Sequence, residues 1–307
     1  MNIRSIKSGF RLLFTDYRNF CSGVWTILHH ILPDKLHLKV LFQKKVGYKL
    51  NLNDPKTFNE KLNWLKLYNR KPEYTMMVDK FAVKEYVAKT IGAEYVAPCI
   101  GVWNNANDID FDKLPNQFVL KTNHNSCSTL VCKDKSNLTN LDGIRRDFNH
   151  FLGKNLFYML GEWPYKNVSP KVFAEAYLDD HQDNELQDYK WWCFDGKPTL
   201  MYQSIKRKDV YENFYDMDYT PVYINHNWPR HTPEFEKPKA FEEMKQLAAK
   251  LSLGIPFVRV DFFYVEGKVY FAELTFFDWA GLRPFDSYET DLKLGELIQL
   301  PKEKTTR

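Results

Sequence analysis

Cysteine is scarce in this chain, and its arrangement argues against two classes of protein. The five cysteines are odd in number and include no C-x-x-C pair: Cys21, Cys99, Cys127, Cys132 and Cys193. A disulfide framework needs paired cysteines, and a structural zinc site needs closely spaced ones. We therefore expect reduced thiols in a cytoplasmic protein.

Long hydrophobic runs, repeats and biased segments are also missing. The apolar stretch 21–32 is interrupted by His29 and His30 and is shorter than the roughly 20 residues that cross a bilayer. The first residues lack the apolar centre of a signal peptide. With 307 residues, 44% hydrophobic and 27% charged, the composition is that of one large or two moderate globular domains.

Positive charge is concentrated in the N-terminal segment. Residues 1–49 hold nine Lys and Arg against two Asp, a net +7, which leaves −3 of the total of +4 for the remainder. Apolar residues recur at helical spacing between these cations: Ile3, Ile6, Phe10, Leu13, Phe14 and Tyr17. The pattern is typical of a helix on an anionic membrane surface, and equally of a helix packed on the body of the protein. We expect no nucleic-acid binding, because the remaining net charge is acidic.

The most informative stretch is residues 257–277, where two apolar segments flank Glu266 and Gly267. A glycine turn between β-type segments predicts a hairpin, and pairing around it puts Asp261 nearly opposite Glu273. Adjacent carboxylates repel unless a cation lies between them, and oxygen ligands suit Mg²⁺ held together with nucleotide phosphates. Arg259 lies on the same face of its strand as Asp261. The alternative is a carboxylate that is merely solvated at a strand end.

A second stretch, residues 118–131, has the layout of a phosphate-binding hairpin loop. An apolar strand ends at Lys121, small polar residues follow, and a second apolar strand closes the unit. Such a loop can donate backbone N–H groups and hydroxyls to phosphates, with Lys121 as the point charge. A solvated lysine at a sheet edge is the alternative.

A third stretch combines two apolar strands, 172–178 and 188–198, joined by an acidic linker. They could form the walls of an adenine slot, with the backbone after Glu175 at the edge of the base and an acid at the ribose. Alternating apolar and polar residues in a strand normally indicate burial of the apolar ones, so we expect Trp191, Trp192 and Phe194 in the core.

In this order the stretches resemble the ATP-grasp superfamily, and within it the TupA-like branch of teichuronopeptide biosynthesis. The resemblance covers about residues 53–285. It rests on several short motifs: Asp54-Pro55-Lys56-Thr57-Phe58-Asn59-Glu60-Lys61, Asp79-Lys80, Lys121 to His124, Asp188 to Lys190, Cys193 to Gly196, Asn213 to Asp216, Val258 to Asp261 and Glu273 to Phe276.

The resemblance implies a role for individual residues. Lys121 would bind the phosphates and act in catalysis with Arg259, which would lie near the transferred phosphoryl group; Asp261 and Glu273 would hold Mg²⁺. The remaining nucleotide contacts would come from the closing loop (His124, Ser126, Ser128), the adenine hinge (Glu175, Ala176, Tyr177, Leu178), and Asp188, at the ribose, with Lys190. The chain departs from the family pattern at Asn125 and Cys127 in the loop, at Thr275, and in the turn 277–281.

The expected fold is α+β: an ATP-grasp fold of two α+β subdomains that enclose a nucleotide cleft, preceded by a helical segment. We expect a basic helical segment at 1–78, a lid subdomain at 79–180 and a C-terminal subdomain with the metal site at 181–307. Helices are expected at 59–68, 80–91 with Asp79 as N-cap, 141–152 and 240–251. Strands are expected at 118–121, 130–132, 172–176, 189–194 and 199–202, besides the hairpin.

The resemblance implies an ATP- and Mg²⁺-dependent ligase of bacterial surface-polysaccharide biosynthesis. It would join an amine to a carboxylate, on a uronic acid or another anionic glycan, through an acylphosphate. A sugar kinase or a glycosyltransferase is the alternative enzyme. A catalytically silent peripheral membrane subunit is the alternative outside enzymes. Lys206, Arg207 and Lys208 would steer an anionic acceptor or form a solvated charge run.

Overall fold

The computed structural model describes residues 32–126, 128–179, 186–206, 210–224 and 230–306. The amphipathic N-terminal pattern, and Arg207 and Lys208, lie outside these residues. Within the described part, no helix is both long and apolar enough to cross a membrane.

Two antiparallel sheets form the frame of the molecule, which confirms the α+β class. The smaller sheet, called the lid sheet here, has the order β1-β4-β2-β3 and the larger sheet has the order β10-β9-β5-β6-β7-β8. The lid strands are β1 (Cys99–Trp103), β2 (Phe118–Thr122), β3 (Thr129–Cys132) and β4 (Val172–Ala176). The larger sheet has β5 (Asp188–Phe194), β6 (Lys197–Lys206), β7 (Val210–Tyr215), β8 (Pro221–Val222), β9 (Val258–Val265) and β10 (Lys268–Thr275).

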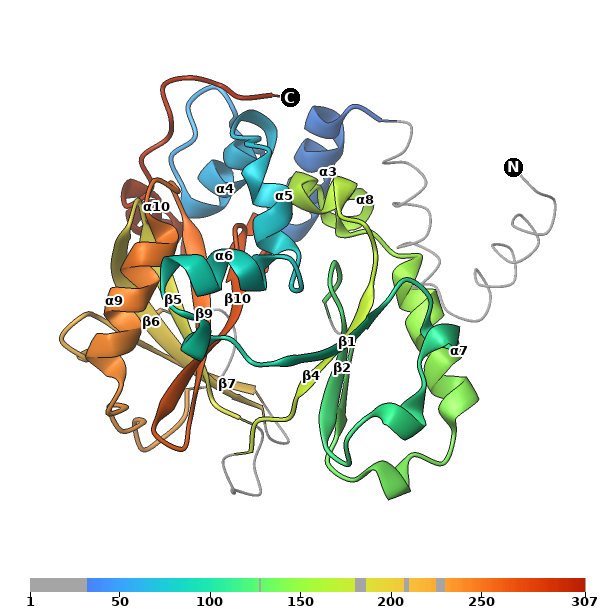
Figure 1. The fold of residues 1–307 in the computed structure, drawn as a ribbon. Helices are drawn as coiled ribbons and strands as arrows, with labels where there is room; N and C mark the ends of the chain where they lie inside the picture. The colour runs from blue at the N-terminus through green and yellow to red at the C-terminus, as the bar shows by residue number, and fades with distance from the viewer. Residues whose placement is uncertain (1–31, 127, 180–185, 207–209, 225–229, 307) are drawn as a thin grey trace.

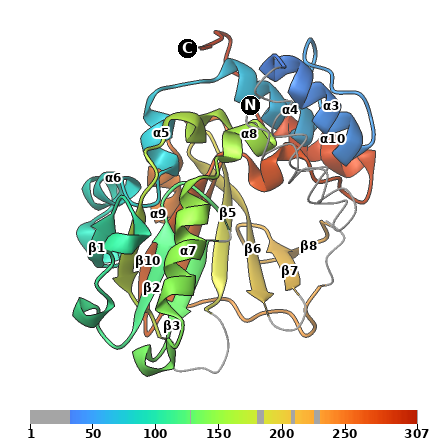
Figure 2. The same cartoon turned by 90° about the vertical axis from the view of Figure 1, so that its right-hand side faces the viewer.

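Helices cover the outer faces of both sheets and gather at one end of the molecule (Figures 1 and 2). Helix α7 (Leu141–Leu152) covers the lid sheet, and α9 (Phe241–Ser252) packs on the larger sheet on the side away from the lid. The end group comprises α3 (Asp34–Val46), α4 (Phe58–Tyr68), α5 (Glu73–Val78), α8 (Leu156–Leu160) and α10 (Tyr288–Glu296). Helix α6 (Val83–Thr90) and 3₁₀ turns η1 (Ala93–Tyr95), η2 (Ala106–Asp108), η3 (Phe111–Lys113), η4 (Lys135–Asn137), η5 (Trp163–Asn167) and η6 (Asp278–Gly281) complete the structure.

Helix starts follow local capping chemistry, with one correction to the prediction. Helix α4 begins with a capping box, in which Thr57 accepts from the Glu60 N–H and the Glu60 side chain accepts from Thr57. Asp79 was expected to cap a helix that starts at residue 80, but α6 starts at Val83. The Asp79 carboxylate instead accepts from the N–H groups of Phe81 and Ala82, and so closes a turn before the helix.

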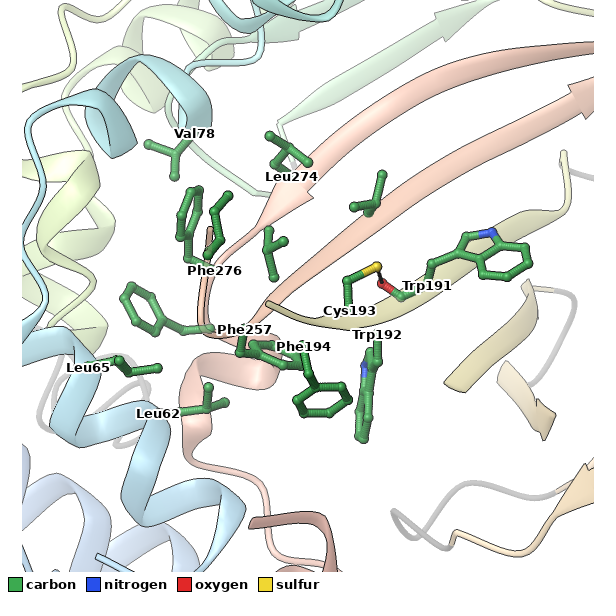
Figure 3. Close-up of a cluster of buried hydrophobic side chains, with 14 of the residues drawn as sticks. Leu62, Leu65, Val78, Trp191, Trp192, Cys193, Phe194, Phe257, Leu274 and Phe276 are labelled. Carbon is green, nitrogen blue, oxygen red and sulfur yellow. Dashed lines mark hydrogen bonds between the residues drawn. The ribbon is translucent and has the colours of Figure 1, made fainter. Parts of the chain in front are cut away.

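The larger sheet and the end helices share the main hydrophobic core, shown in Figure 3, while the lid has a smaller core of its own under α7. Trp191, Trp192 and Phe194 are buried as predicted. Trp191 packs on Phe241 of α9, whereas Trp192 stacks on Phe58 of α4 at 4.9 Å. One face of the larger sheet is therefore closed by α9. On the opposite face α4 covers Trp192, and beyond it the same face carries Arg259, Asp261 and Phe263.

The other predicted strands and helices are present within a few residues of their expected bounds, except that β6 is longer than predicted. Strands β1, β7 and β8 were not predicted. The lid strands fall inside the proposed lid range and the strands of the larger sheet inside the C-terminal range. The exact subdomain limits stay a prediction.

Candidate active site

The predicted hairpin forms, and its register brings the two carboxylates together. Strands β9 and β10 pair so that Asp261 lies opposite Glu273. The turn residues Glu266 and Gly267 both have left-handed φ, 49° and 79°, as a tight hairpin turn requires. The turn alone would place Asp261 opposite Ala272, and a bulge between Phe271 and Glu273 shifts the pairing by one residue, which brings Glu273 opposite Asp261.

Arg259 holds both carboxylates in this conformation. Its Nε and Nη2 atoms donate to the two Asp261 oxygens at 2.7 and 2.6 Å, and Nη2 also donates to Glu273 Oε1 at 2.8 Å. Its Nη1 donates to Asp278, which also accepts from Trp192 Nε1 at 2.9 Å. The guanidinium thus lies at the centre of three carboxylates and fixes their orientation.

Lys190 extends this polar cluster along the sheet. It lies opposite Asp261 in the register of β5 and β9, and its Nζ is 3.5 Å from Asp261 and 2.6 Å from Asp188. Asp188, the predicted ribose-binding acid, is therefore paired with Lys190 beside the hairpin. Its role at a ribose stays a prediction.

Across from the hairpin, the lid presents lysines tied to one glutamate. Lys121, on β2, is ion-paired with Glu175 on β4, and Lys84 of α6 pairs with the same carboxylate at 2.9 Å. Lys80 donates to the Asn125 carbonyl at 2.8 Å and lies 3.8 Å from Glu273. Lys80 therefore connects the β2–β3 loop of the lid to the hairpin of the larger sheet.

A pocket lies between the two sheets at this point. Its polar lining comes from Lys121 and Glu175 of the lid sheet, from Lys84 of α6 and from Lys80 before that helix. Its apolar lining includes Phe173 of the lid sheet, Phe263, Phe271 and Ala272 of the larger sheet, and Leu178. The phenylalanines supply flat apolar walls and the lysines a positive rim, which is the combination that a nucleotide base and its phosphates require.

Sequence reasoning missed Lys80, Lys84, Phe263 and Phe271 as pocket residues. For the two phenylalanines a signal was available: Phe263 lies two positions beyond Asp261, and Phe271 two before Glu273, on the same strands. For the two lysines the sequence offers no comparable pattern, since a turn and a helix bring them to the pocket.

The β2–β3 loop lies between the two predicted strands, but two of its three predicted phosphate-binding residues are buried in the protein. His124 is fully buried; its Nδ1 lies 3.1 Å from Asn123 Oδ1 and its Nε2 3.0 Å from the Lys154 carbonyl, and burial lowers its pKa. Ser128 is buried and bonded to Thr122, whereas Ser126 is exposed. In this conformation only Ser126 of the three predicted loop residues is directed to solvent. The role of all three at phosphates stays a prediction.

The surrounding charges keep two of the site carboxylates ionised. Burial alone would raise the pKa of Glu273, but Lys80, Arg259 and Lys190 outweigh it and lower that pKa to about 2. Burial likewise opposes ionisation of Glu175, and Lys121 and Lys84 reverse the effect, so that its pKa is also lowered. Both groups are therefore anionic ligands at neutral pH.

Sequence comparison decides the family of the chain. A model of the TupA-like ATP-grasp family matches residues 60–299. The chain belongs to the TupA-like ATP-grasp family. This confirms the resemblance drawn from the motifs, and it identifies the two-sheet architecture as an ATP-grasp fold. No curated protein matches the chain.

Solved structures with some similarity to this chain include two ligases and a synthetase. D-alanine–D-alanine ligase from Helicobacter pylori is 17% identical, with a TM-score of 0.42 over 79% of this chain and 69% of that one. D-cycloserine synthetase DcsG is 13% identical, with a TM-score of 0.41 over 74% and 70%. The ATP-grasp ligase PsnB, solved with a minimal precursor, is 11% identical, with a TM-score of 0.39 over 67% of this chain and only 54% of PsnB. At these scores the similarities carry no conclusion about activity.

The hairpin of this TupA-like protein fits Mg²⁺ by its donor chemistry. Asp261 and Glu273 offer carboxylate oxygens, and Mg²⁺ is commonly held by one or two carboxylates together with substrate phosphates and water. The Thr275 hydroxyl, which donates to Glu273 at 3.1 Å, stands next to them. In the described ranges, no group of three or more His, Cys, Asp or Glu residues is placed to hold a metal. The two carboxylates therefore suit a metal that arrives with a nucleotide.

Proposed function

We propose that this protein is an ATP- and Mg²⁺-dependent ligase that joins an amine to a carboxylate. The observation that carries the proposal is the cluster of Arg259, Asp261 and Glu273, which lies beside a phenylalanine-lined pocket. Lys80 lines that pocket together with Lys121 of the lid sheet and reaches Glu273 at 3.8 Å. Membership in the ATP-grasp family supports a nucleotide as the occupant of this pocket.

The nucleotide would lie between the sheets with its base among Phe173, Phe263 and Phe271. The backbone at 176–178 would contact the edge of the base, and Lys121 would bind the phosphate chain. Because Lys121 is now paired with Glu175, it would exchange that carboxylate for a phosphate while Lys84 keeps Glu175 paired. Asp188 and Lys190 would serve the ribose or the phosphates from the neighbouring strand.

The proposed reaction has two steps. An oxygen of the carboxylate substrate attacks the γ-phosphorus of ATP, the bond to the leaving ADP oxygen breaks, and an acylphosphate forms. The amine nitrogen then attacks the acyl carbon, the carbon–oxygen bond to phosphate breaks, and an amide, phosphate and a proton are released. Arg259 would stabilise the charge that develops on the transferred phosphoryl group. When bound by Asp261 and Glu273, Mg²⁺ would neutralise phosphate charge.

By its family the enzyme is proposed to act in the biosynthesis of a bacterial surface polysaccharide, with a uronic acid or another anionic glycan as the carboxylate substrate. Contact of the basic N-terminal segment with the inner face of the cytoplasmic membrane belongs to the same proposal. Supporting it is the charge of residues 1–49, nine Lys and Arg against two Asp.

One experiment tests the reaction class. The protein is incubated with ATP, Mg²⁺, uronic-acid glycans and amino acids, and the products are identified by mass. An amide formed together with equal amounts of ADP and phosphate is the expected result. A phosphorylated glycan without added amine would replace the ligase by a kinase, and glycosyl transfer from a nucleotide sugar without ATP would replace it by a glycosyltransferase. Absence of Mg²⁺-dependent ATP binding would refute the nucleotide site itself.

A further inference from the structure

A strained turn follows the hairpin and leads away from the nucleotide pocket. Trp279, Ala280 and Gly281 all have left-handed φ, 47°, 56° and 55°. For the two residues that are not glycine this conformation is unfavourable, so the surrounding structure must impose it. At Gly281 a Cβ atom would come within 2.8 Å of Leu62 Cβ, which excludes a larger residue there.

Helix α4 and Arg259 hold this turn in place. Lys66 Nζ donates to the Ala280 carbonyl at 2.7 Å, and Asn63 Nδ2 donates to the Gly281 carbonyl at 2.7 Å. Asp278, which begins the turn, is bonded to Arg259. The strained segment is thus connected directly to the residue that we place at the transferred phosphoryl group.

The turn exposes an aromatic ring and brings a guanidinium over it. The side chain of Trp279 is 43% exposed although it lies beside the buried cluster, and the guanidinium carbon of Arg283 is 4.1 Å from its ring centroid. A half-exposed tryptophan on a rigid, strained turn is costly to maintain for packing alone, and it forms a flat apolar platform beside a fixed cation.

Glu212 lies next to this cation with one oxygen unsatisfied. It sits on β7, its side chain is 6% exposed, and its Oε2 atom has no hydrogen-bond partner among the described residues. Arg283 Nη1 is 3.7 Å from that oxygen, which is too far for a hydrogen bond. A buried carboxylate oxygen without a donor is unfavourable, so a donor from a bound molecule would be stabilising.

Glu212 lies near the end of the site where we place the transferred phosphoryl group. Burial raises its pKa to about 7, against the charge of Arg283, and Asp278, Lys190 and Arg259 also act on it electrostatically. None of these residues lines the phenylalanine pocket. The Glu212 region is therefore adjacent to the reacting centre and separate from the base-binding pocket.

We propose that Glu212, Arg283 and Trp279 form the subsite for the amine substrate, and that this substrate is an α-amino acid. Its ammonium group donates to Glu212, its carboxylate accepts from Arg283, and its body lies against Trp279. The nearest atoms of Glu212 and Arg283 are 3.7 Å apart, and the opposite charges of these side chains match the two ends of a zwitterion. A sugar hydroxyl is uncharged and would need neither of them. The inference rests on the proposed ligase function and specifies its amine.

In the reaction, Glu212 receives a proton from the ammonium group and frees the nitrogen lone pair for attack on the acyl carbon. The proton then leaves with the released phosphate or to solvent, and the carboxylate is restored. The raised pKa of Glu212 supports this role, because a base with a pKa near the working pH transfers protons most effectively.

Calorimetric titration of the full chain tests the subsite. The protein is saturated with ADP and Mg²⁺ and titrated with each of the common L-amino acids and with D-alanine and D-glutamate. For each amino acid that binds, the N-acetyl and α-amide derivatives follow. We expect at least one amino acid to bind, each derivative to bind at least tenfold more weakly, and Glu212→Gln and Arg283→Lys each to weaken binding at least tenfold.

Glu234→Gln is the matched control, because Glu234 also binds side chains of β7, accepting from Asn213 Nδ2 at 2.7 Å and from Tyr215 at 2.9 Å, and is ion-paired with Arg230. It should leave amino-acid affinity unchanged, and all three variants should keep the wild-type affinity for ADP, which also shows that they are folded. Wild-type protein that binds ADP but no amino acid, or Glu212→Gln with undiminished affinity, would overturn the subsite. Loss of ADP binding in the wild type would instead refute the proposed function.

Discussion

Replacing Lys121 by methionine isolates the contribution of one lysine to nucleotide binding. A charge-assisted hydrogen bond to a phosphate contributes about 1.5–3 kcal/mol. Lys121 must first leave Glu175, and this partly exposed ion pair is worth about 0–1 kcal/mol. The net loss for Lys121→Met is then about 0.5–3 kcal/mol, or roughly twofold to more than a hundredfold in affinity. Because Lys84 keeps Glu175 paired at 2.9 Å, the fold should remain intact.

Calorimetry with a non-hydrolysable ATP analogue and saturating Mg²⁺ measures this loss. Lys113→Met is the matched control, since Lys113 belongs to the same lid but its side chain is 85% exposed and paired with Asp110. Glu175→Gln has the opposite expected sign: it releases Lys121 from its partner, so affinity should be unchanged or rise a few fold. Equal affinity in wild type and Lys121→Met would mean that the β2–β3 hairpin does not bind phosphates. A Glu175→Gln variant as weak as Lys121→Met would mean that Glu175 itself holds the nucleotide.

Three further predictions concern the hairpin, pH and metal. Asp261→Asn combined with Glu273→Gln should abolish ADP release and leave the melting temperature within a few degrees; near-normal turnover would remove the metal role. In the folded protein, burial raises the pKa of Glu212 from 4.5 to about 7. Because the unfolded chain loses this proton at lower pH than the folded one, the free energy of unfolding falls as pH rises through that interval, by up to about 3 kcal/mol. Between pH 5.5 and 7.5 wild type should therefore lose unfolding free energy relative to Glu212→Gln in urea titrations, and parallel curves would contradict the buried ionisable group. Finally, EDTA should weaken ATP binding at least tenfold in calorimetry, and an unchanged affinity would exclude a metal-assisted site.

The hairpin could be predicted because all of its determinants are local. Glu266 and Gly267 set the turn, and the turn sets a register that would place Asp261 opposite Ala272, next to Glu273. The bulge between Phe271 and Glu273, which was not predicted, shifts the pairing by one residue and brings Glu273 opposite Asp261. The lid hairpin around Lys121 was predictable for the same reason. The partners that these residues bind could not be predicted from the local sequence. Arg259, expected only near a phosphoryl group, binds both predicted metal ligands in the described conformation.

Residues that reach the site through tertiary packing could not be predicted. Lys84 is a helix residue whose partner Glu175 lies on a distant strand, and nothing in the local pattern distinguishes it from a solvated lysine. His124 follows the opposite course: it belongs to a loop with a binding pattern, but its ring turns inward to the carbonyl of Lys154, 30 residues later. The left-handed conformation at Trp279 is imposed by α4 and could not be read from a sequence that has glycine only at position 281.

The charges of the site explain why a metal and a nucleotide should enter together. The ion pairs described above connect five cationic side chains with five carboxylates, so the protein contributes no net charge: Lys80, Lys84, Lys121, Lys190 and Arg259 against Glu175, Asp188, Asp261, Glu273 and Asp278. ATP brings about four negative charges into this balanced cluster, and each lysine or arginine that turns to a phosphate leaves a carboxylate behind. A divalent cation held by Asp261 and Glu273 would neutralise phosphate charge and reduce the dependence of these carboxylates on Arg259. We expect Arg259 then to turn toward the transferred phosphoryl group.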